Sequence, residues 1–282
     1  DGFLESATPP SEPGGFGSVA LKNSGTVLEC DAFVSCCGRK GASARLGLEH
    51  LGLTPLRNGT LAVDDDMRCC DTQSEDEADG TGGSCPPCPV RLYAAGDIAG
   101  PSRIKPGGLV STGIAQAHVA CTHAFPEDWQ NFAPDWPAEF VQHPPSVVWV
   151  DPTVAWVGLS QVEAEEQWGG PEQVGNVIVP YNATVKSCVR PMDGYFLKLI
   201  YRMCDGRVLG VHIFGPDAGE MINQGAALVN QNGFDTVWEL VRSIPAAVTF
   251  QEIFKIAAFE AALSIEERWN HETHSECIQA IE

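Results

Sequence analysis

Four cysteines lie close together in one acidic, glycine-rich stretch, and their thiols could do chemistry directly. The stretch at residues 64–89 reads DDDMRCCDTQSEDEADGTGGSCPPCP. The C-x-x-C spacing of Cys85 and Cys88 lets two thiolates meet one tetrahedral zinc ion, and the adjacent pair Cys69 and Cys70 could supply two more, with poorer geometry. A redox-active or structural disulfide and a solvated loop of ordinary thiols are the alternatives. The sequence leaves all three open.

The cysteine content as a whole favours a reducing compartment. Eleven cysteines is an odd number, and in a chain of this length it favours reduced thiols, buried like small apolar residues, over a secreted disulfide scaffold. Asn58 and Asn182 begin N-x-T glycosylation patterns, which often arise by chance. We therefore expect an intracellular protein, in the cytoplasm or inside an organelle such as a mitochondrion or plastid.

Composition and charge exclude several classes of partner. Of the 282 residues, 44% are hydrophobic and 19% charged, and 17 Lys and Arg against 37 Asp and Glu give a net charge of −20. This charge repels phosphate backbones and anionic lipid, so we expect no binding to nucleic acid or to a membrane surface. Since no apolar run approaches the roughly 20 residues of a spanning helix, we also expect no transmembrane segment.

The stretch before residue 143 has the pattern of an α/β fold. Strands are predicted at 18–21, 25–30, 31–37, 59–64 and 91–97, a short helix or turn at 46–53, and a helix of small residues at 107–123 with Pro106 well placed as its first residue. The run 31–37 indicates a buried strand that ends at the carboxyl edge of a sheet, where α/β sheets bind ligands. The acidic stretch 64–89 is expected to be a surface loop, because it has almost no apolar content.

From about residue 144 the pattern changes to an α+β module. Strands are predicted at 147–150, 154–157, 174–181, 195–202 and 207–214, and helices at 160–167, 218–230, 235–242 and 250–262. Ser160 is the predicted cap of the first helix, and Asp205-Gly206 is a hairpin signal. The charged end, residues 266–282, is expected to be a peripheral tail.

The order of these motifs resembles the pyridine nucleotide-disulfide oxidoreductase flavoproteins over roughly residues 15–265. The likeness lies in CGR at 37–39, GTLAVD at 59–64, LYAAGDI at 92–98, DPTVAWVGLS at 151–160, FLKLIYRMCDGRVLGVHIFGPDAGEMI at 196–222 and TFQEIFKIAAFEA at 249–261. Within the family, the soluble (Si-specific) pyridine nucleotide transhydrogenases are the nearest likeness and dihydrolipoamide dehydrogenase is the competitor.

The resemblance implies a fold and a division into domains. It implies the C-terminal parts of FAD- and NAD(P)-binding, Rossmann-like domains, followed by an α+β dimerisation domain. We expect residues 1–45 to end the NAD(P)-binding domain and residues 46–143 to return to the FAD-binding domain and to contain the insert 64–89. Residues 144–265 would then form the dimerisation domain and 266–282 the tail.

The resemblance also assigns roles at the expected flavin site. In the family, the Asp of the strand-terminal Gly-Asp accepts a hydrogen bond from a ribityl hydroxyl of FAD, and this role falls on Asp97 beside Gly96. A glycine permits close backbone approach, and a carboxylate orients a sugar-alcohol chain by a charge-assisted bond. The start of the following helix, near Gly107 and Gly108, would stabilise negative charge that develops on the reduced flavin.

Parts of the family's nucleotide sites are absent from the sequence. Gly38-Arg39 matches the Gly-Arg that approaches the nicotinamide nucleotide in the family. The two G-x-G-x-x-G fingerprints for FAD and NAD(P) are absent, and we interpret the glycines of 14–17 as a loop. Because pyrophosphate binding depends on those helix N-termini, we expect this chain alone not to hold either cofactor tightly.

A second difference from the family concerns the reaction that the protein could catalyse. The family's disulfide reductases carry His-Pro-Thr ahead of a Glu, and the His acts as acid/base for the thiols. In register with Thr249 and Glu252, this chain has Ala247 and Val248 in place of His and Pro. Hydride exchange between two nicotinamide nucleotides through a flavin needs no acid/base there.

We therefore expect the C-terminal part of a FAD-dependent oxidoreductase that transfers hydride between NADPH or NADH and NAD(P)+. Activity would require an N-terminal half or a partner chain carrying the nucleotide-binding fingerprints, in a homodimer or larger complex. The alternatives are a non-catalytic structural subunit derived from this family and an enzyme resembling dihydrolipoamide dehydrogenase.

Overall fold

The computed structural model describes most of the chain, and the described part divides into two compact units. It describes residues 4–22, 24–34, 36, 38–70, 91–100, 102, 104, 108–128, 143–230 and 235–279, without the side chains of Leu4 and of residues 271–279. The units are residues 1–40 and 41–282. No helix among the described residues is long and apolar enough to span a membrane.

The first unit is a small antiparallel sheet in the order β1-β2-β3. Its strands are β1 (Leu4–Thr8), β2 (Gly17–Leu21) and β3 (Val27–Cys30). Val19 pairs with Leu28, as expected of a hairpin. The predicted hairpin is therefore confirmed, whereas β1 was not predicted because LESAT has little β-branched or aromatic content to mark it.

The predicted buried strand at 31–37 is wrong. Its described residues, 31–34 and 36, belong to no strand, and Phe33 and Val34 are 46% and 77% exposed. A buried strand of a parallel sheet needs hydrogen-bonded neighbours. Among the described residues no strand pairs with this run, so its apolar side chains are left exposed.

The described residues of 41–128 contain little regular secondary structure besides one long helix. Its elements are the 3-10 helices η1 (Leu48–Leu51) and η3 (Gly96–Ile98) and the helix α1 (Val110–Ala124). The predicted strands 59–64 and 91–97 form only isolated bridges, such as the parallel one between Leu61 and Ala99. The helix begins at Val110 rather than 107, while Pro106 and Gly107 lie outside the described residues.

Met67, Cys69 and Cys70, near the start of the acidic insert, are buried, in contrast to the surface loop expected for 64–89. The Asp64 carboxylate accepts hydrogen bonds from the backbone N–H groups of Asp66 and Arg68, at 3.0 and 2.9 Å. This turn places Met67, which is fully buried, against Ile104 and other apolar side chains. The fold therefore uses the few apolar residues at the base of the insert as core, while residues 71–89 lie outside the described part.

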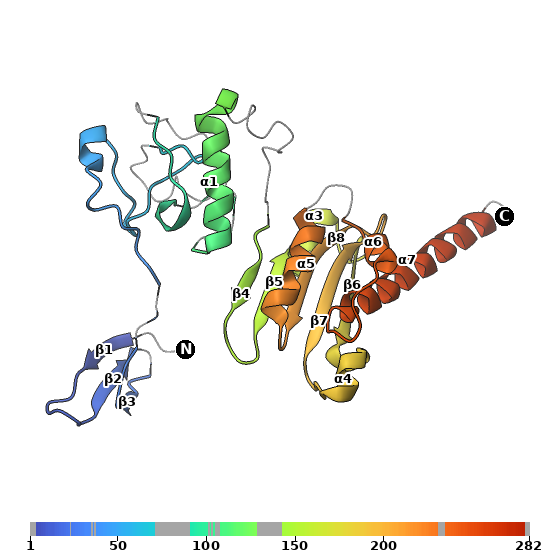
Figure 1. Ribbon diagram of the computed structural model, residues 1–282, viewed down its shortest axis with the longest axis horizontal. Coiled ribbons are helices and arrows are strands. Elements are labelled where there is room, and N and C mark those ends of the chain that lie inside the picture. The colour runs from blue at the N-terminus through green and yellow to red at the C-terminus, as the bar shows by residue number, and fades with distance from the viewer. Residues whose placement is uncertain are drawn as a thin grey trace. The chain divides into compact units, whose positions relative to one another are not determined.

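Residues 143–279 form a five-stranded antiparallel sheet with helices on both faces (Figure 1). The strands, in the order β4-β5-β8-β7-β6, are β4 (Ser146–Val148), β5 (Val154–Gly158), β8 (Val208–Phe214), β7 (Phe196–Arg202) and β6 (Val174–Pro180). All five match predicted strands. The Asp-Gly hairpin is also present, because Gly206 has a φ of 73° between β7 and β8.

Local sequence signals such as caps mark the helices of this part of the chain. They are α3 (Gln161–Trp168), η4 (Tyr181–Ala183), α4 (Val185–Val189), α5 (Ala218–Asn230), α6 (Val237–Arg242) and α7 (Glu252–Gln279). Ser160 and Glu163 form a reciprocal capping box at the start of α3, as expected for the predicted cap. Because α7 runs to Gln279, most of the expected tail at 266–282 continues this helix.

The main core lies between the sheet and two of these helices. α5 packs on β5 and β8, and α7 packs on β6 and β7 (Figure 1). Leu199 on β7 belongs to this core, whereas the next residue, Ile200, packs with Ala164 of α3 in a separate cluster on the opposite face. The period-2 alternation of the strand thus distributes its side chains between the two helix layers.

Replacing Leu199 should test this core. Leu199 is fully buried, so Leu199→Ala should lower the free energy of unfolding by about 2–5 kcal/mol through lost burial and a residual cavity. The measurement is urea denaturation. Ile178→Ala on the neighbouring strand is the matched control, because Ile178 is 55% exposed; equal losses in the two variants would contradict the described packing.

Two half-buried histidines should make this part of the chain sensitive to acid. Burial lowers the pKa of His143 and of His212, and the His212 ring lies 3.0 Å from the Leu159 carbonyl oxygen. A lowered pKa in the folded state means that the unfolded chain binds the proton more readily. Stability is then complete above the ordinary histidine pKa of about 6.5 and decreases as the pH falls below it.

The urea midpoint of the chain should therefore fall between pH 7 and pH 5, and it should fall less in the double variant His143→Gln, His212→Gln. Glutamine cannot take up a proton, and its amide can still donate to the Leu159 carbonyl. An unchanged pH dependence in this variant would rule out these two side chains as the source.

Candidate functional site

The Gly96-Asp97 turn is fixed by the fold. Gly96 has a φ of 80°, a left-handed conformation that favours glycine, and it begins the 3-10 helix η3. The Gly96 N–H donates to Oε1 of Gln116 at 2.8 Å. Asp97, the next residue, is exposed beside this fixed backbone.

Gln116 connects this turn to α1 and was not singled out by the sequence. Its amide accepts from Gly96 and also donates from Nε2 to Oγ of Ser102 at 3.1 Å, and Ser102 donates to the Ile104 carbonyl at 3.2 Å. Gln116 is only 2% exposed. A polar side chain at a buried helical position, in register with Thr112, is the signal that could have identified it.

α1 approaches the turn closely through a glycine. A Cβ added to Gly113 would lie 3.2 Å from the Gly96 Cα, which is tighter than ordinary packing. The helix has Leu109 as its N-cap, without a side-chain capping bond. Gly108, with a φ of 82°, precedes that cap. The N-terminus of α1 therefore belongs to the same local structure as Gly96 and can stabilise negative charge.

The predicted site residues are only partly brought together. Gly96, Asp97 and Gly108 lie in the unit that contains α1, and Gly107 lies outside the described residues. Gly38, with a φ of 114°, and Arg39 belong to the other unit. Within its unit, the structure brings the Gly96-Asp97 turn close to α1, whereas Gly38 and Arg39 are described with the first unit.

Cys70 does not fit the zinc alternative for the cysteines of the insert. Cys70 is disulfide-bonded, and a cysteine in a disulfide has no thiolate to give to a metal. Cys69 is fully buried, and Cys85 and Cys88 lie outside the described residues. No cluster of metal-ligating side chains occurs in the part of the chain that the structure describes. The disulfide alternative fits Cys70 better.

The segment between α6 and α7 carries no acid/base side chain at the family's His position. Ala247 and Val248 are exposed there, and the Thr249 hydroxyl donates to the Ala246 carbonyl at 2.6 Å. One carboxylate oxygen of Glu252 is buried without a hydrogen-bond partner among the described residues. Proton transfer to a thiol cannot come from an alanine or a valine at this position.

Comparison with known proteins supports the expected family. The profile of the pyridine nucleotide-disulphide oxidoreductase dimerisation domain matches residues 144–258. The soluble pyridine nucleotide transhydrogenase of Marinobacter nauticus is 29% identical over 218 residues, which cover 77% of this chain and 40% of that protein. The transhydrogenase of Hahella chejuensis is 28% identical over 244 residues, which cover 86% of this chain and 45% of that protein.

Solved structures show the same fold. LpdA from Mycobacterium tuberculosis has a TM-score of 0.70 at 23% identity and covers 92% of this chain and 48% of its own. The HOCl-induced flavoprotein disulfide reductase RclA from Escherichia coli has a TM-score of 0.63 at 18% identity, and the match covers 91% of this chain and 50% of that one. The chain thus spans about half the length of the proteins it matches.

The expected fold class, C-terminal parts of nucleotide-binding domains followed by a dimerisation domain, is confirmed. Residues 144–258 match the dimerisation domain of the pyridine nucleotide-disulphide oxidoreductases, and the chain is similar over most of its length to about half of soluble pyridine nucleotide transhydrogenases.

Proposed function

We propose that this chain is the C-terminal part of a FAD-dependent oxidoreductase that exchanges hydride between NADPH or NADH and NAD(P)+. The observation that carries the proposal is the pair Ala247 and Val248 at the family's acid/base position, in a chain whose curated relatives are transhydrogenases. Disulfide reduction needs a proton donor and acceptor at that position, whereas hydride exchange between nucleotides does not.

The Gly96 turn fits a flavin cofactor. Asp97 would hold a ribityl hydroxyl by a charge-assisted bond, on a backbone that Gln116 keeps in place. The N-terminus of α1 would favour negative charge on the flavin ring. When bound, FAD would supply the chemistry of accepting a hydride and passing it on.

The proposal requires a second component. Because the chain spans about half of its relatives and contains neither G-x-G-x-x-G fingerprint, the pyrophosphates of FAD and NAD(P) would be bound by an N-terminal half or a partner chain. Residues 144–258 would join two copies into a homodimer, in which matching patches face each other.

A non-catalytic structural subunit is the second candidate, and the missing fingerprints favour it. An enzyme resembling dihydrolipoamide dehydrogenase is disfavoured by Ala247. The test is to isolate the complete protein, or the complex that contains this chain, and to record its flavin absorption band and its hydride transfer from NADPH to an NAD+ analogue. A complex with neither property would overturn the enzyme proposal.

Replacing Asp97 should weaken flavin binding. Loss of a hydrogen bond to a charged group costs about 1.5–3 kcal/mol, so Asp97→Ala should reduce the affinity of the complete protein for FAD by roughly 10- to 150-fold. Flavin content after dialysis and titration of the apoprotein measure the effect. Asp151→Ala, at another exposed carboxylate, is the control; full flavin affinity in Asp97→Ala would refute the contact.

Replacing Gln116 should loosen the turn without touching the cofactor. Gln116→Leu removes the partners of the Gly96 N–H and of Ser102, and leaving such groups unsatisfied costs about 1–3 kcal/mol of folding stability. Gln161→Leu on α3 is a matched control, because Gln161 also makes two side-chain hydrogen bonds but is partly exposed. We expect the larger fall in urea midpoint, and a loss of flavin, only in Gln116→Leu.

A further inference from the structure

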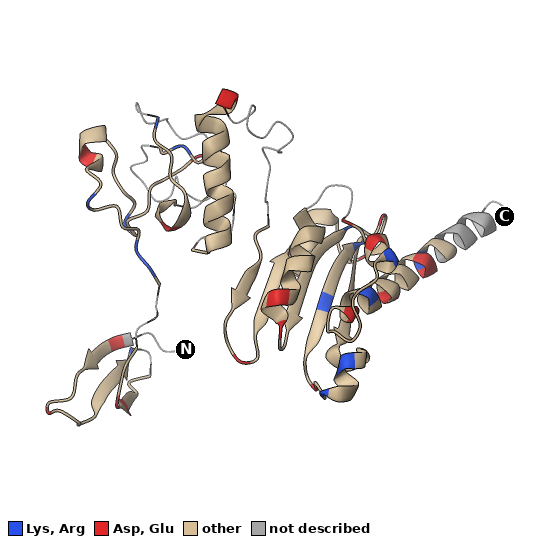
Figure 2. Ribbon diagram, viewed as in Figure 1, with Lys and Arg blue, Asp and Glu red and all other residues tan. Residues whose placement is uncertain are grey.

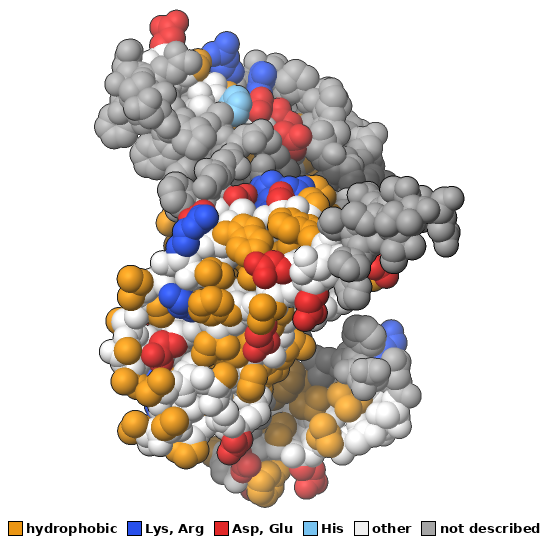
Figure 3. Space-filling model, turned by 90° about the vertical axis from the view of Figure 1, so that its right-hand side faces the viewer, with side chains coloured by type: hydrophobic (Ala, Val, Ile, Leu, Met, Phe, Trp, Pro, Cys, Tyr) orange, Lys and Arg blue, Asp and Glu red, His pale blue; other side chains and the backbone are white. Residues whose placement is uncertain are grey.

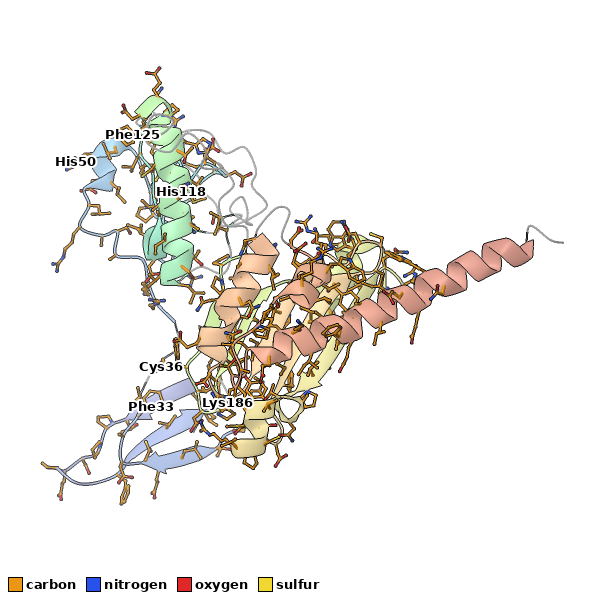
Figure 4. All side chains as sticks on the ribbon, turned by 45° about the vertical axis from the view of Figure 1, so that its right-hand side comes forward. Phe33, Cys36, His50, His118, Phe125 and Lys186 are labelled. Carbon is orange, nitrogen blue, oxygen red and sulfur yellow. The ribbon has the colours of Figure 1, made fainter. Side chains whose placement is uncertain are left out.

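Cys70 is the only cysteine in a disulfide among those that the structure describes. It is 3% exposed, and the neighbouring Cys69, a reduced thiol, is fully buried. The exposed Cys36, labelled in Figure 4, is reduced as well. The cysteine content favours a reducing compartment, where disulfides are usually transient and serve catalysis or redox sensing. The bond at Cys70 therefore needs an explanation of its own.

The bonding partner of Cys70 follows by elimination. Six described cysteines are reduced: Cys30, Cys36, Cys69, Cys121, Cys188 and Cys204. The remaining ones are Cys37, Cys85, Cys88 and Cys277. Cys37 belongs to the other compact unit, and Cys277 lies near the far end of α7. Cys85 and Cys88 are nearest in the chain, and the shortest loop costs the least entropy to close.

The composition of the insert provides no other way to hold its two ends together. Residues 71–89 contain no Lys, Arg or large apolar residue, so their side chains offer little apolar burial and no ion pair with one another. Met67, in the base of the insert (residues 67–70), packs against α1, which also lacks Lys and Arg (Figure 2). On the face that Figure 3 presents, by contrast, acidic side chains lie scattered among apolar and basic ones. A covalent bond at Cys70 supplies the missing connection.

Backbone hydrogen bonds join the base of the insert to the candidate site. The Cys69 N–H donates to the Leu92 carbonyl at 2.8 Å, and the Ala94 N–H donates to the Met67 carbonyl at 3.0 Å. The segment from Leu92 to Ala94 leads directly into the turn of the candidate site. A change in the covalent state of the base therefore acts on a segment that this turn continues.

We propose that Cys70 and the C-P-P-C pair form a reversible disulfide, which fixes the base of the insert and the segment before the Gly96 turn when oxidised and releases both when reduced. The inference concerns the covalent state of the chain and does not rest on the proposed function.

The reductant of this step is a dithiol. One of its thiolates attacks the sulfur bonded to Cys70, and Cys70 leaves as a thiolate; the second thiol of the reductant then resolves the mixed disulfide. Two electrons and two protons pass from the dithiol, which becomes a disulfide, to Cys70 and its partner, which become thiols.

The fold can accommodate the reduced state of Cys70. Its Sγ lies 3.5 Å from the Arg68 carbonyl oxygen, and a thiol at this place can donate its S–H to that oxygen. The buried group therefore has a hydrogen-bond acceptor in place after reduction, as a reversible bond requires.

Alkylation of the complete protein tests the bond. Samples with and without prior incubation with dithiothreitol are treated with iodoacetamide in guanidinium chloride, where burial protects no thiol, and their peptides are identified by mass spectrometry. We expect Cys70 to be alkylated only after dithiothreitol, and to be linked to Cys85 or Cys88 without it. Cys69, the internal control, should be alkylated in both samples. Alkylation of Cys70 without reductant, or a link to Cys37 or Cys277, would overturn the inference.

Hydrogen exchange of the native complete protein tests the release. Amides of residues 92–96 should exchange several-fold faster after dithiothreitol than before it. In Cys70→Ala they should exchange at the faster rate in both conditions, whereas Cys69→Ala, at an equally buried but reduced cysteine, should keep the dependence on dithiothreitol. The unsubstituted protein decides even where Cys70→Ala does not fold: equal exchange of residues 92–96 before and after reduction would refute the switch.

Discussion

The buried amide of Gln116 is the interaction on which the candidate site depends. It accepts from the Gly96 N–H and donates to Ser102, so it joins a turn, a loop and a helix that are separated in sequence. An amide offers both an acceptor and donors on one rigid group, which an alanine or leucine at this position could not do. Because Gly113 has no side chain, α1 can come close to the turn at Gly96. The position of the Asp97 backbone follows from these two constraints.

The two parts of the second unit are stabilised differently. Residues 143–279 enclose a large core between a sheet and two long helices, whereas residues 41–128 bury two small clusters around Leu48 and Met67. Small cores leave little free energy to offset chain entropy.

The sequence predicts structure correctly where signals within a few residues determine it. It fails where contacts with residues far along the chain determine it. Ser160, and Asp205 with Gly206, predict a helix cap and a hairpin, and both are present because each signal is complete within a few residues. The run at 31–37 has the composition of a buried strand, but strand formation depends on neighbours that the described residues do not supply. Gln116 was missed for the same reason, since its importance comes from hydrogen bonds to residues 14 and 20 positions away.

The lack of an acid/base side chain at Ala247 tells more about the possible reaction than any other feature of the candidate site. In the family's disulfide reductases a His precedes a Glu, and here Glu252 remains while Ala247 replaces the His. One carboxylate oxygen of Glu252 is buried without a hydrogen-bond partner among the described residues. A site that had kept dithiol chemistry would need a replacement base at this position, and Ala246, Ala247 and Val248 offer none. Hydride exchange, which would need orientation and electrostatics rather than a proton carrier at this position, is the reaction that we propose for the complete protein.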